Sequence, residues 1–191
     1  MSDVEGLVYA ARPKLIGPGV RFHLQHDAID WSIGARSGRL ALADVVSVRL
    51  SFHPGQLAAP NYEMRLRGRR GEDLKIGSLS RTSLTGVEDN RAAYAGFVRA
   101  VHAALAARGG AVRCEAGLPP WRWWLMGALA LVTGLGLLAV LASAVRAGQW
   151  SVAGLIAVLC PLLGWPLVET LWRNKPAPYS LASLPLRLLP G

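Results

Sequence analysis

Five basic side chains lie within eleven residues and are the strongest candidates in this sequence for contact with an anionic partner. They are Arg65, Arg67, Arg69, Arg70 and Lys75. The first two alternate with apolar residues, so they share one face of an extended strand, and the next two stand between glycines, as in a turn. Three nearby acids offset part of this charge, namely Glu63, Glu72 and Asp73. Two interpretations stay open: an exposed hairpin that pairs with itself, or a surface that contacts anionic lipid headgroups or an acidic partner.

The histidines of the chain lack the spacing of a metal site. His23 and His26 would point to opposite faces of an extended strand, and His102 adjoins the apolar stripe of a predicted helix. The sequence also has no Gly-x-Ser-x-Gly segment, phosphate-binding loop or dinucleotide-binding fingerprint. We therefore predict no catalytic residue, no metal, no cofactor and no enzymatic activity. The net charge of +9 is spread along the chain without a recognition helix, so we also predict no nucleic-acid partner.

Two long apolar segments dominate the second half of the chain. No charged side chain occurs in residues 123–145 or in residues 150–168. As helices, at about 1.5 Å per residue, these segments would be roughly 34 Å and 28 Å long, close to the roughly 30 Å hydrocarbon thickness of a bilayer. We predict a transmembrane helical hairpin over residues 123–172, with its helices at 123–145 and 150–172.

Small residues and prolines within this hairpin indicate where helices could meet. They are Ala130, Gly134, Ala139, Ser143, Pro161 and Pro166. The first four form two small-xxx-small pairs, which permit close contact between helices. The prolines remove amide donors from the second helix and should bend it. The contacting helix is either the hairpin's own second helix, or one supplied by a partner protein or by self-association.

Charges beside the hairpin predict its topology. Basic residues cluster before the first helix and after the second, whereas the loop between the helices offers only Arg146. By the positive-inside rule, both termini face the cytoplasm. Residues 1–5 are acidic and no apolar stretch follows them, so we predict no signal peptide. Cys114 and Cys160 imply no disulfide in such a setting.

Residues 1–112 have the pattern of a small soluble domain. Apolar and polar residues alternate over several short segments, which predicts about six or seven strands; the clearest are 20–24, 29–33, 46–52 and 62–66. A helical stripe follows, made of Tyr94, Phe97, Val98, Val101 and Leu105. Antiparallel strands followed by one amphipathic helix bury both apolar faces when the helix packs on the sheet. We therefore predict an α+β fold.

Residues 6–108 resemble a pleckstrin-homology-like domain of the bacterial type, a small antiparallel barrel or sandwich capped by a C-terminal helix. The likeness rests on residues 8–13 (VYAARP), residues 39–48 (RLALADVVSV) and the helix at 94–105. Bacterial membrane proteins of this family combine such domains with hydrophobic helices. Phosphoinositide-binding members hold the headgroup with Lys and Arg around their first hairpin loop. We assign that loop to residues 24–28, which lack a basic cluster, and so expect no inositol phosphate site.

The pattern and the resemblance together predict four regions. These are a cytoplasmic pleckstrin-homology-like domain at 1–112, a basic and aromatic linker at 113–122, the transmembrane hairpin at 123–172, and a Pro/Leu-rich cytoplasmic tail at 173–191. The expected function is a non-enzymatic interaction or scaffold protein at a bacterial inner membrane. Its expected partners are the lipid bilayer and a membrane protein or a second copy. One alternative is an accessory subunit that docks through its hairpin; another is a component of a membrane enzyme or transporter.

Overall fold

The computed structural model describes residues 6–12, 19–54, 60–81 and 87–190. The chain divides into two compact units: unit 1 comprises Met1–Gly117 and Ala177–Gly191, and unit 2 comprises Leu118–Pro176. The prediction that no signal peptide is present concerns residues 1–5, which lie outside the described residues. Each unit is considered by itself below.

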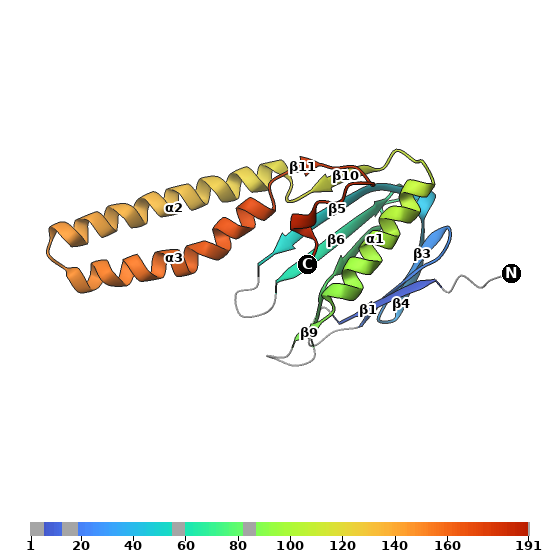
Figure 1. Ribbon diagram of the computed structural model, residues 1–191, viewed down its shortest axis with the longest axis horizontal. Coiled ribbons are helices and arrows are strands. Elements are labelled where there is room, and N and C mark those ends of the chain that lie inside the picture. Colours follow the sequence, from blue (N-terminus) through green and yellow to red (C-terminus); the bar gives the residue numbers. More distant parts are fainter. Residues whose placement is uncertain (1–5, 13–18, 55–59, 82–86, 191) are drawn as a thin grey trace. The chain divides into compact units, whose positions relative to one another are not determined.

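Unit 1 contains a four-stranded antiparallel sheet, called sheet A (Figure 1). Its strands follow one another in space as they do in sequence: β1 (Leu7–Ala11), β2 (Val20–Leu24), β3 (Ala28–Ile33) and β4 (Arg36–Ala41). The predicted pairing of residues 20–24 with 29–33 is confirmed, with Leu24 opposite Ile29 and Phe22 opposite Trp31. Phe22 and Ile29 are fully buried, so the alternation in the sequence reports one buried face.

A second sheet, sheet B, has five strands in the order β11-β10-β5-β6-β7. They are β5 (Val45–His53), β6 (Asn61–Gly68), β7 (Asp73–Gly77), β10 (Arg113–Ala116) and β11 (Ala177–Pro178). Strand β10 runs parallel to β5, and the other neighbouring pairs are antiparallel. A short helix, η1 (Leu42–Asp44), links the two sheets, and β8 (Leu79–Arg81) pairs with β9 (Val87–Asp89).

The helix α1 (Arg91–Ala107) covers the core of unit 1 with the predicted apolar stripe. All five stripe residues are at most 1% exposed. They belong to one hydrophobic cluster with residues of both sheets, among them Tyr9, Val48 and Leu66. The helix and the sheets thus bury their apolar faces against each other, and the α+β class is confirmed.

The chain returns to unit 1 after the two long helices. Leu188, in the short helix η2 (Leu186–Leu188), is fully buried, and the neighbouring Leu189 is 4% exposed. Both side chains are part of the core cluster of unit 1. The sequence-based regions ended the soluble domain at 112 and set 173–191 apart as a tail. The structure instead joins 113–117 and 177–190 to unit 1, because their strands and leucines complete its sheet and core.

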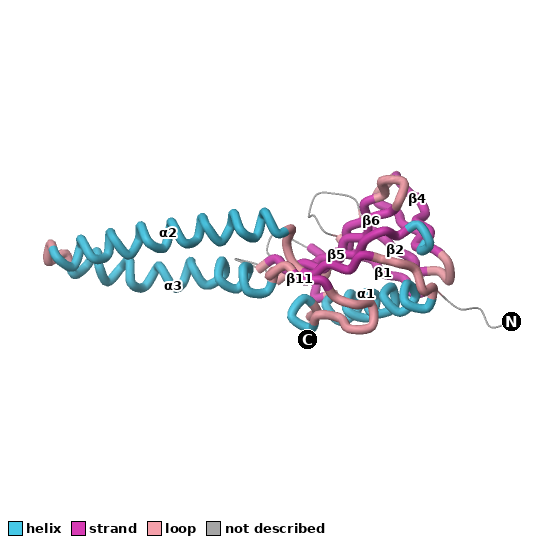
Figure 2. Tube along the Cα trace, turned by 90° about the horizontal axis from the view of Figure 1, so that it is seen from above, coloured by secondary structure: helices cyan, strands magenta, loops and turns pink. Residues whose placement is uncertain are grey.

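Unit 2 is a pair of long helices that lie side by side in both views (Figures 1 and 2). They are α2 (Pro120–Arg146) and α3 (Trp150–Arg173), joined by a turn in which Gly148 has φ of +69°. Both are long and apolar enough to cross a membrane. The linkers on either side of the pair are hydrogen bonded, with the Leu118 amide donating to the Asn174 carbonyl over 3.1 Å.

Candidate interaction surfaces

The outer face of sheet B carries ordered rows of charged side chains. The strand register places Glu115, Arg49, Arg65 and Lys75 in one row across β10, β5, β6 and β7. It places Arg113, Ser47, Arg67 and Asp73 in the next row. The residues between these positions, such as Leu66 and Leu74, are buried on the opposite face. Three of the five predicted basic residues, Arg65, Arg67 and Lys75, therefore share one face of the sheet.

Arg65 is occupied by an ion pair within this face. Its Nε lies 2.6 Å from Oδ1 of Asp73, and a second guanidinium nitrogen contacts Oδ2 of the same carboxylate. This bidentate bond holds the pKa of Asp73 below its ordinary value and raises the pKa of Arg65. An Arg that already fills both oxygens of a carboxylate offers less to an external anion. For Arg65, the self-paired interpretation describes the structure better.

Arg49 is occupied in the same way, because its guanidinium pairs with Glu115 and also donates to the Gly117 carbonyl over 3.3 Å. In contrast, Arg67, Lys75 and Arg113 are exposed and form no ion pair with another described residue. Arg67 and Lys75 still lower the pKa of Asp73 through space. On this outer face Arg49 and Arg65 are therefore held in ion pairs, whereas Arg67, Lys75 and Arg113 form none with the described residues.

In the turn between β6 and β7 the backbone amides are hydrogen bonded, and the side chains of Arg69 and Arg70 are exposed. The Arg69 amide donates to the Asp44 carbonyl over 2.8 Å, and the Arg70 amide donates to a Glu72 carboxylate oxygen over 3.1 Å. Gly71 has φ of +90°, a conformation that favours glycine. The Arg70 side chain is 80% exposed, and its Nε lies 4.0 Å from the Asp44 carboxylate. This turn presents guanidinium groups on a fixed backbone.

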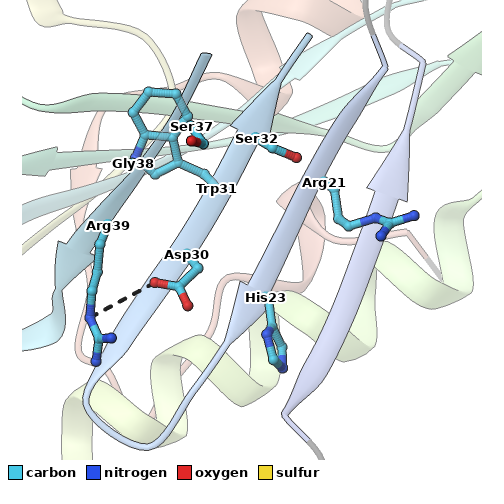
Figure 3. A pocket seen from close by; sticks show the side chains of 8 residues that line it. All are labelled: Arg21, His23, Asp30, Trp31, Ser32, Ser37, Gly38 and Arg39. Atoms are coloured by element: carbon cyan, nitrogen blue, oxygen red, sulfur yellow. Dashed lines mark ion pairs between the residues drawn. The ribbon is translucent and has the colours of Figure 1, made fainter. Parts of the chain in front are cut away.

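Sheet A bears a shallow hollow of about 460 Å³, which is lined by polar and charged side chains together with Trp31 and Gly38 (Figure 3). Cross-strand pairing puts His23, Asp30 and Arg39 in one row, and Arg21, Ser32 and Ser37 in the next. Arg39 bonds Asp27 over 2.8 Å and lies 3.8 Å from Asp30. This face is polar and mixed in charge, and the sequence patterns did not single it out.

A second hollow, of about 540 Å³, lies where β1 ends and β2 begins, and it is called the Arg12 cavity below. Its polar lining consists of Arg12, Arg21, Ser32, Ser80 and Asn90. No carboxylate lines it, and neither guanidinium pairs with an acid in the described part of the chain. The 5%-exposed Ser80 accepts a hydrogen bond from the Arg12 amide over 3.1 Å.

The strand pairing beside the Arg12 cavity corrects one assignment made from the sequence. Residues 24–28 were taken as the first hairpin loop, but they connect β2 to β3, and the first hairpin pairs β1 with β2. Strand β1 ends at Ala11 and β2 begins at Val20, and residues 13–18 between them lie outside the described residues. The short apolar strand β1 carries little alternation, so the sequence favoured the clearer pair that follows. Unlike residues 24–28, the facing ends of β1 and β2 carry basic residues nearby, namely Arg12 and Arg21.

A buried polar cluster joins the end of the chain to α1. His102 is 1% exposed; its Nδ1 donates to the Val98 carbonyl over 2.8 Å, and its Nε2 accepts from the Tyr179 hydroxyl over 2.8 Å. Burial lowers the pKa of His102, so the imidazole is neutral. The Tyr179 amide donates to the Cys114 carbonyl over 3.2 Å, and burial raises the pKa of the Cys114 thiol. This cluster is closed by its own hydrogen bonds and holds the returning chain.

The predicted helix-packing residues separate into two groups. Ala130 and Gly134 are partly buried, on the same side of α2 as Trp123, Leu141 and Ala144. In chain order these positions are separated by seven, four, seven and three residues, which keeps them on one side of a helix, as in a helix-packing seam. The Trp123 indole donates to the Leu171 carbonyl of α3 over 2.8 Å, whereas a Cβ at Gly134 would meet no atom within 4 Å in the described part of the chain.

The other small residues lie outside that seam. Ala139 and Ser143 are exposed, and the Ser143 hydroxyl donates to the Ala139 carbonyl over 2.9 Å. In α3, Pro161 is exposed and Pro166 is partly buried, and the Pro166 carbonyl accepts from the Thr170 hydroxyl over 2.6 Å.

Comparisons with protein-family models, with curated proteins and with solved structures find no match for this chain. The observed architecture is an α+β unit with two sheets and one covering helix, into which a pair of long apolar helices is inserted between β10 and β11. Among the described residues, no group of three or more His, Cys, Asp or Glu side chains is arranged to hold a metal.

Proposed function

We propose that this chain is a membrane-anchored, non-enzymatic interaction protein of the inner membrane of a bacterium. In this proposal α2 and α3 cross the bilayer, and unit 1 is a pleckstrin-homology-like binding domain at its cytoplasmic face. Anchoring raises the concentration of unit 1 near partners in the same membrane, which strengthens otherwise weak contacts. The basis of the proposal is the exposure of two apolar helices that leave and rejoin one sheet at neighbouring strands.

The exposure of α2 and α3 supports a lipid environment. In the most apolar 18-residue stretch of each helix, no part of α2 and only 6% of α3 is buried within the protein. Core helices of a soluble fold are mostly buried, so α2 and α3 differ from them. Leu131, Leu138 and Leu162 are each more than 60% exposed. Side chains of this kind in water would form a patch far larger than soluble monomers display. Lipid tails are the simplest partner for such a surface.

The pairing of β10 with β11 supports a hairpin whose two ends lie on the same side of the bilayer. Ala116 pairs with Ala177, and each of these residues is separated from its long helix by three residues. Such a linker spans at most about 14 Å between the flanking Cα atoms, much less than the thickness of a bilayer. Two crossings satisfy this constraint, and a single crossing does not.

Membrane fractionation and cysteine labelling test the anchor. Carbonate washing at high pH should leave the chain in the membrane pellet, and detergent should release it. In a variant with Cys114→Ser and Cys160→Ala, a membrane-impermeant thiol reagent should label Gln149→Cys and Ser183→Cys from opposite sides. Release by carbonate, or labelling of both positions from one side, would contradict the two-crossing anchor.

An accessory subunit of a larger membrane complex is the main alternative, with the exposed Ala139 and Ser143 side of α2 as its docking element. Mass measurement after purification in mild detergent separates the two functions. A stable assembly with a second membrane protein favours the subunit, whereas a solitary monomer or homodimer favours the anchored domain.

The Arg12 cavity favours a second role for unit 1, contact with anionic headgroups. Among the described residues, its polar lining consists of two guanidinium groups that form no ion pair, two hydroxyls and an amide, without a carboxylate. Each cation near a bilayer surface contributes about 1 kcal/mol to attraction by anionic lipid. Double replacement of Arg12 and Arg21 by Gln should reduce the binding of anionic vesicles to detergent-purified chain by at least tenfold. Unchanged vesicle binding would remove this role.

A further inference from the structure

The base of the helix pair, where α2 begins and α3 ends, gathers tryptophan side chains. The Trp123 indole donates to the Leu171 carbonyl over 2.8 Å, so these two helix ends lie beside each other. Three further indoles at this end are between 67% and 70% exposed, namely Trp121, Trp124 and Trp172. Exposed indoles in membrane proteins concentrate at the level of the lipid headgroups. The base of unit 2 therefore has the side chains of a segment in contact with headgroups.

The tip of the helix pair lies about one bilayer thickness from the base. Trp124 and Arg146 of α2 are 22 residues apart in sequence, and so are Trp150 and Trp172 of α3. At about 1.5 Å per residue each of these pairs spans about 33 Å, close to the roughly 30 Å hydrocarbon core of a bilayer. Both helices thus reach the two headgroup levels together, and this follows from the geometry of unit 2 alone.

The two ends of the helix pair differ in charge. The tip carries Arg146, whereas the base carries Arg122, Arg173 and Lys175. Glu169 is the only acidic residue of unit 2, and its carboxylate lies 2.9 Å from the Arg173 guanidinium. Arg122 is exposed and forms no ion pair with another described residue, and Lys175 is also exposed. Three cations and one acid leave the base with a net charge of +2.

From these observations we propose that the base of the helix pair binds the phosphate groups of anionic phospholipids, through Arg122 and Lys175 beside the exposed indoles. This inference rests on the proposed membrane anchor, which puts the ends of α2 and α3 among headgroups. At that depth the anions around an exposed guanidinium are lipid phosphates, with which arginine forms charge-assisted hydrogen bonds. Phosphatidylglycerol presents its phosphate without the compensating ammonium of phosphatidylcholine, so the base should prefer it.

Fluorescence quenching by lipids spin-labelled near the glycerol end of an acyl chain tests the site. In the Cys114→Ser/Cys160→Ala background, the full chain in mixed nanodiscs carries a fluorophore at Leu125→Cys, three residues from Arg122, or at Val145→Cys, at the tip. Both positions are exposed, at 62% and 41% respectively. The preference is the ratio of quenching by labelled phosphatidylglycerol to quenching by labelled phosphatidylcholine at equal content. It should be larger at Leu125→Cys than at Val145→Cys.

Two matched variants remove one cation from either end of α2. Arg122→Gln should lower the preference at Leu125→Cys by about fivefold, the factor that one cation near an anionic surface contributes. Arg146→Gln should change it by less than about twofold, because the tip is about 33 Å away and the Debye length is about 8 Å.

Equal losses in the two variants, or no preference at Leu125→Cys in the parent chain, would overturn the lipid site and leave Arg122 as a determinant of topology only. In that case the fluorophores would still be quenched by lipid, and the anchor would stand. Absence of quenching of both fluorophores by either lipid would instead contradict the membrane anchor, and the site with it. The two failures are therefore distinguishable.

Discussion

The Tyr179 hydroxyl donates a 2.8 Å hydrogen bond to Nε2 of His102, across 77 positions of sequence. Between these residues the chain leaves unit 1, forms α2 and α3, and returns. The bond fixes the residue that follows β11 onto the helix that covers the core. Unit 1 is therefore completed by the segment that comes after the long helices, and its folding depends on a hairpin that closes correctly.

Replacing Tyr179 by Phe should destabilise the protein by about 1 to 3 kcal/mol, because Nε2 of His102 would remain buried without a donor. Thermal unfolding in detergent, followed through the strand signal in circular dichroism, measures the change. The matched control is Tyr62→Phe, which also alters an aromatic residue of unit 1; the Tyr62 hydroxyl has no hydrogen-bond partner among the described residues, so its loss should have a smaller effect. An unchanged melting temperature for Tyr179→Phe would show that the bond does not stabilise the returning chain.

Acid should destabilise unit 1 partly through His102. Burial lowers the pKa of this imidazole below its ordinary value of 6.5, so the unfolded chain takes up a proton at pH values where the folded one does not. Its contribution to stability is complete above pH 6.5 and falls as the pH drops toward the folded pKa, by at most about 1.4 kcal/mol per pH unit. The difference in unfolding free energy between the parent and His102→Gln should therefore shrink from pH 8 to pH 5.5. A constant difference would contradict this assignment.

Two buried tyrosines should respond differently to loss of their hydroxyls. The Tyr94 hydroxyl has no hydrogen-bond partner among the described residues, whereas the Tyr9 hydroxyl donates to the Gly77 carbonyl over 2.6 Å. Tyr94→Phe should be neutral or stabilising by up to about 1 kcal/mol, and Tyr9→Phe should cost about 0.5 to 1.5 kcal/mol. Each variant serves as the control for the other in the same unfolding measurement. Strong destabilisation by Tyr94→Phe would indicate a partner that the fold conceals.

Bulky substitutions should separate the two groups of small residues in α2. Ala144→Leu puts a larger side chain at a 6%-exposed position of the seam and should destabilise the helix pair by about 1 to 3 kcal/mol. Ala139→Leu lies on the exposed side and should change the stability of an isolated chain by less than about 0.5 kcal/mol. Detergent unfolding of the monomer measures both. If Ala139→Leu also releases a co-purifying membrane protein, the accessory-subunit function gains support; equal destabilisation by both variants would contradict the seam.

Local pattern determined much of this protein. Alternation along residues 20–24 and 62–66 predicted strands because one face of each sheet is buried, and the stripe from Tyr94 to Leu105 predicted α1 for the same reason. The apolar segments predicted α2 and α3. Acids close to the basic residues made self-pairing one of two open interpretations, and the Arg65–Asp73 bond, between residues eight positions apart in one hairpin, agrees with that interpretation for Arg65.

The tertiary structure alone decided which distant segments meet. Arg49 pairs with Glu115 because β10 lies beside β5 in a parallel register. Tyr179 bonds His102 because the chain rejoins the same sheet after the two long helices. The strand order β11-β10-β5-β6-β7 places the exit to the helices and the basic turn at different ends of sheet B. Alternation reports which side of a strand is buried, but not which strand lies beside it, because the same apolar face can pack in many orders. Sequence therefore determined the elements, and long-range pairing determined the surfaces that they form.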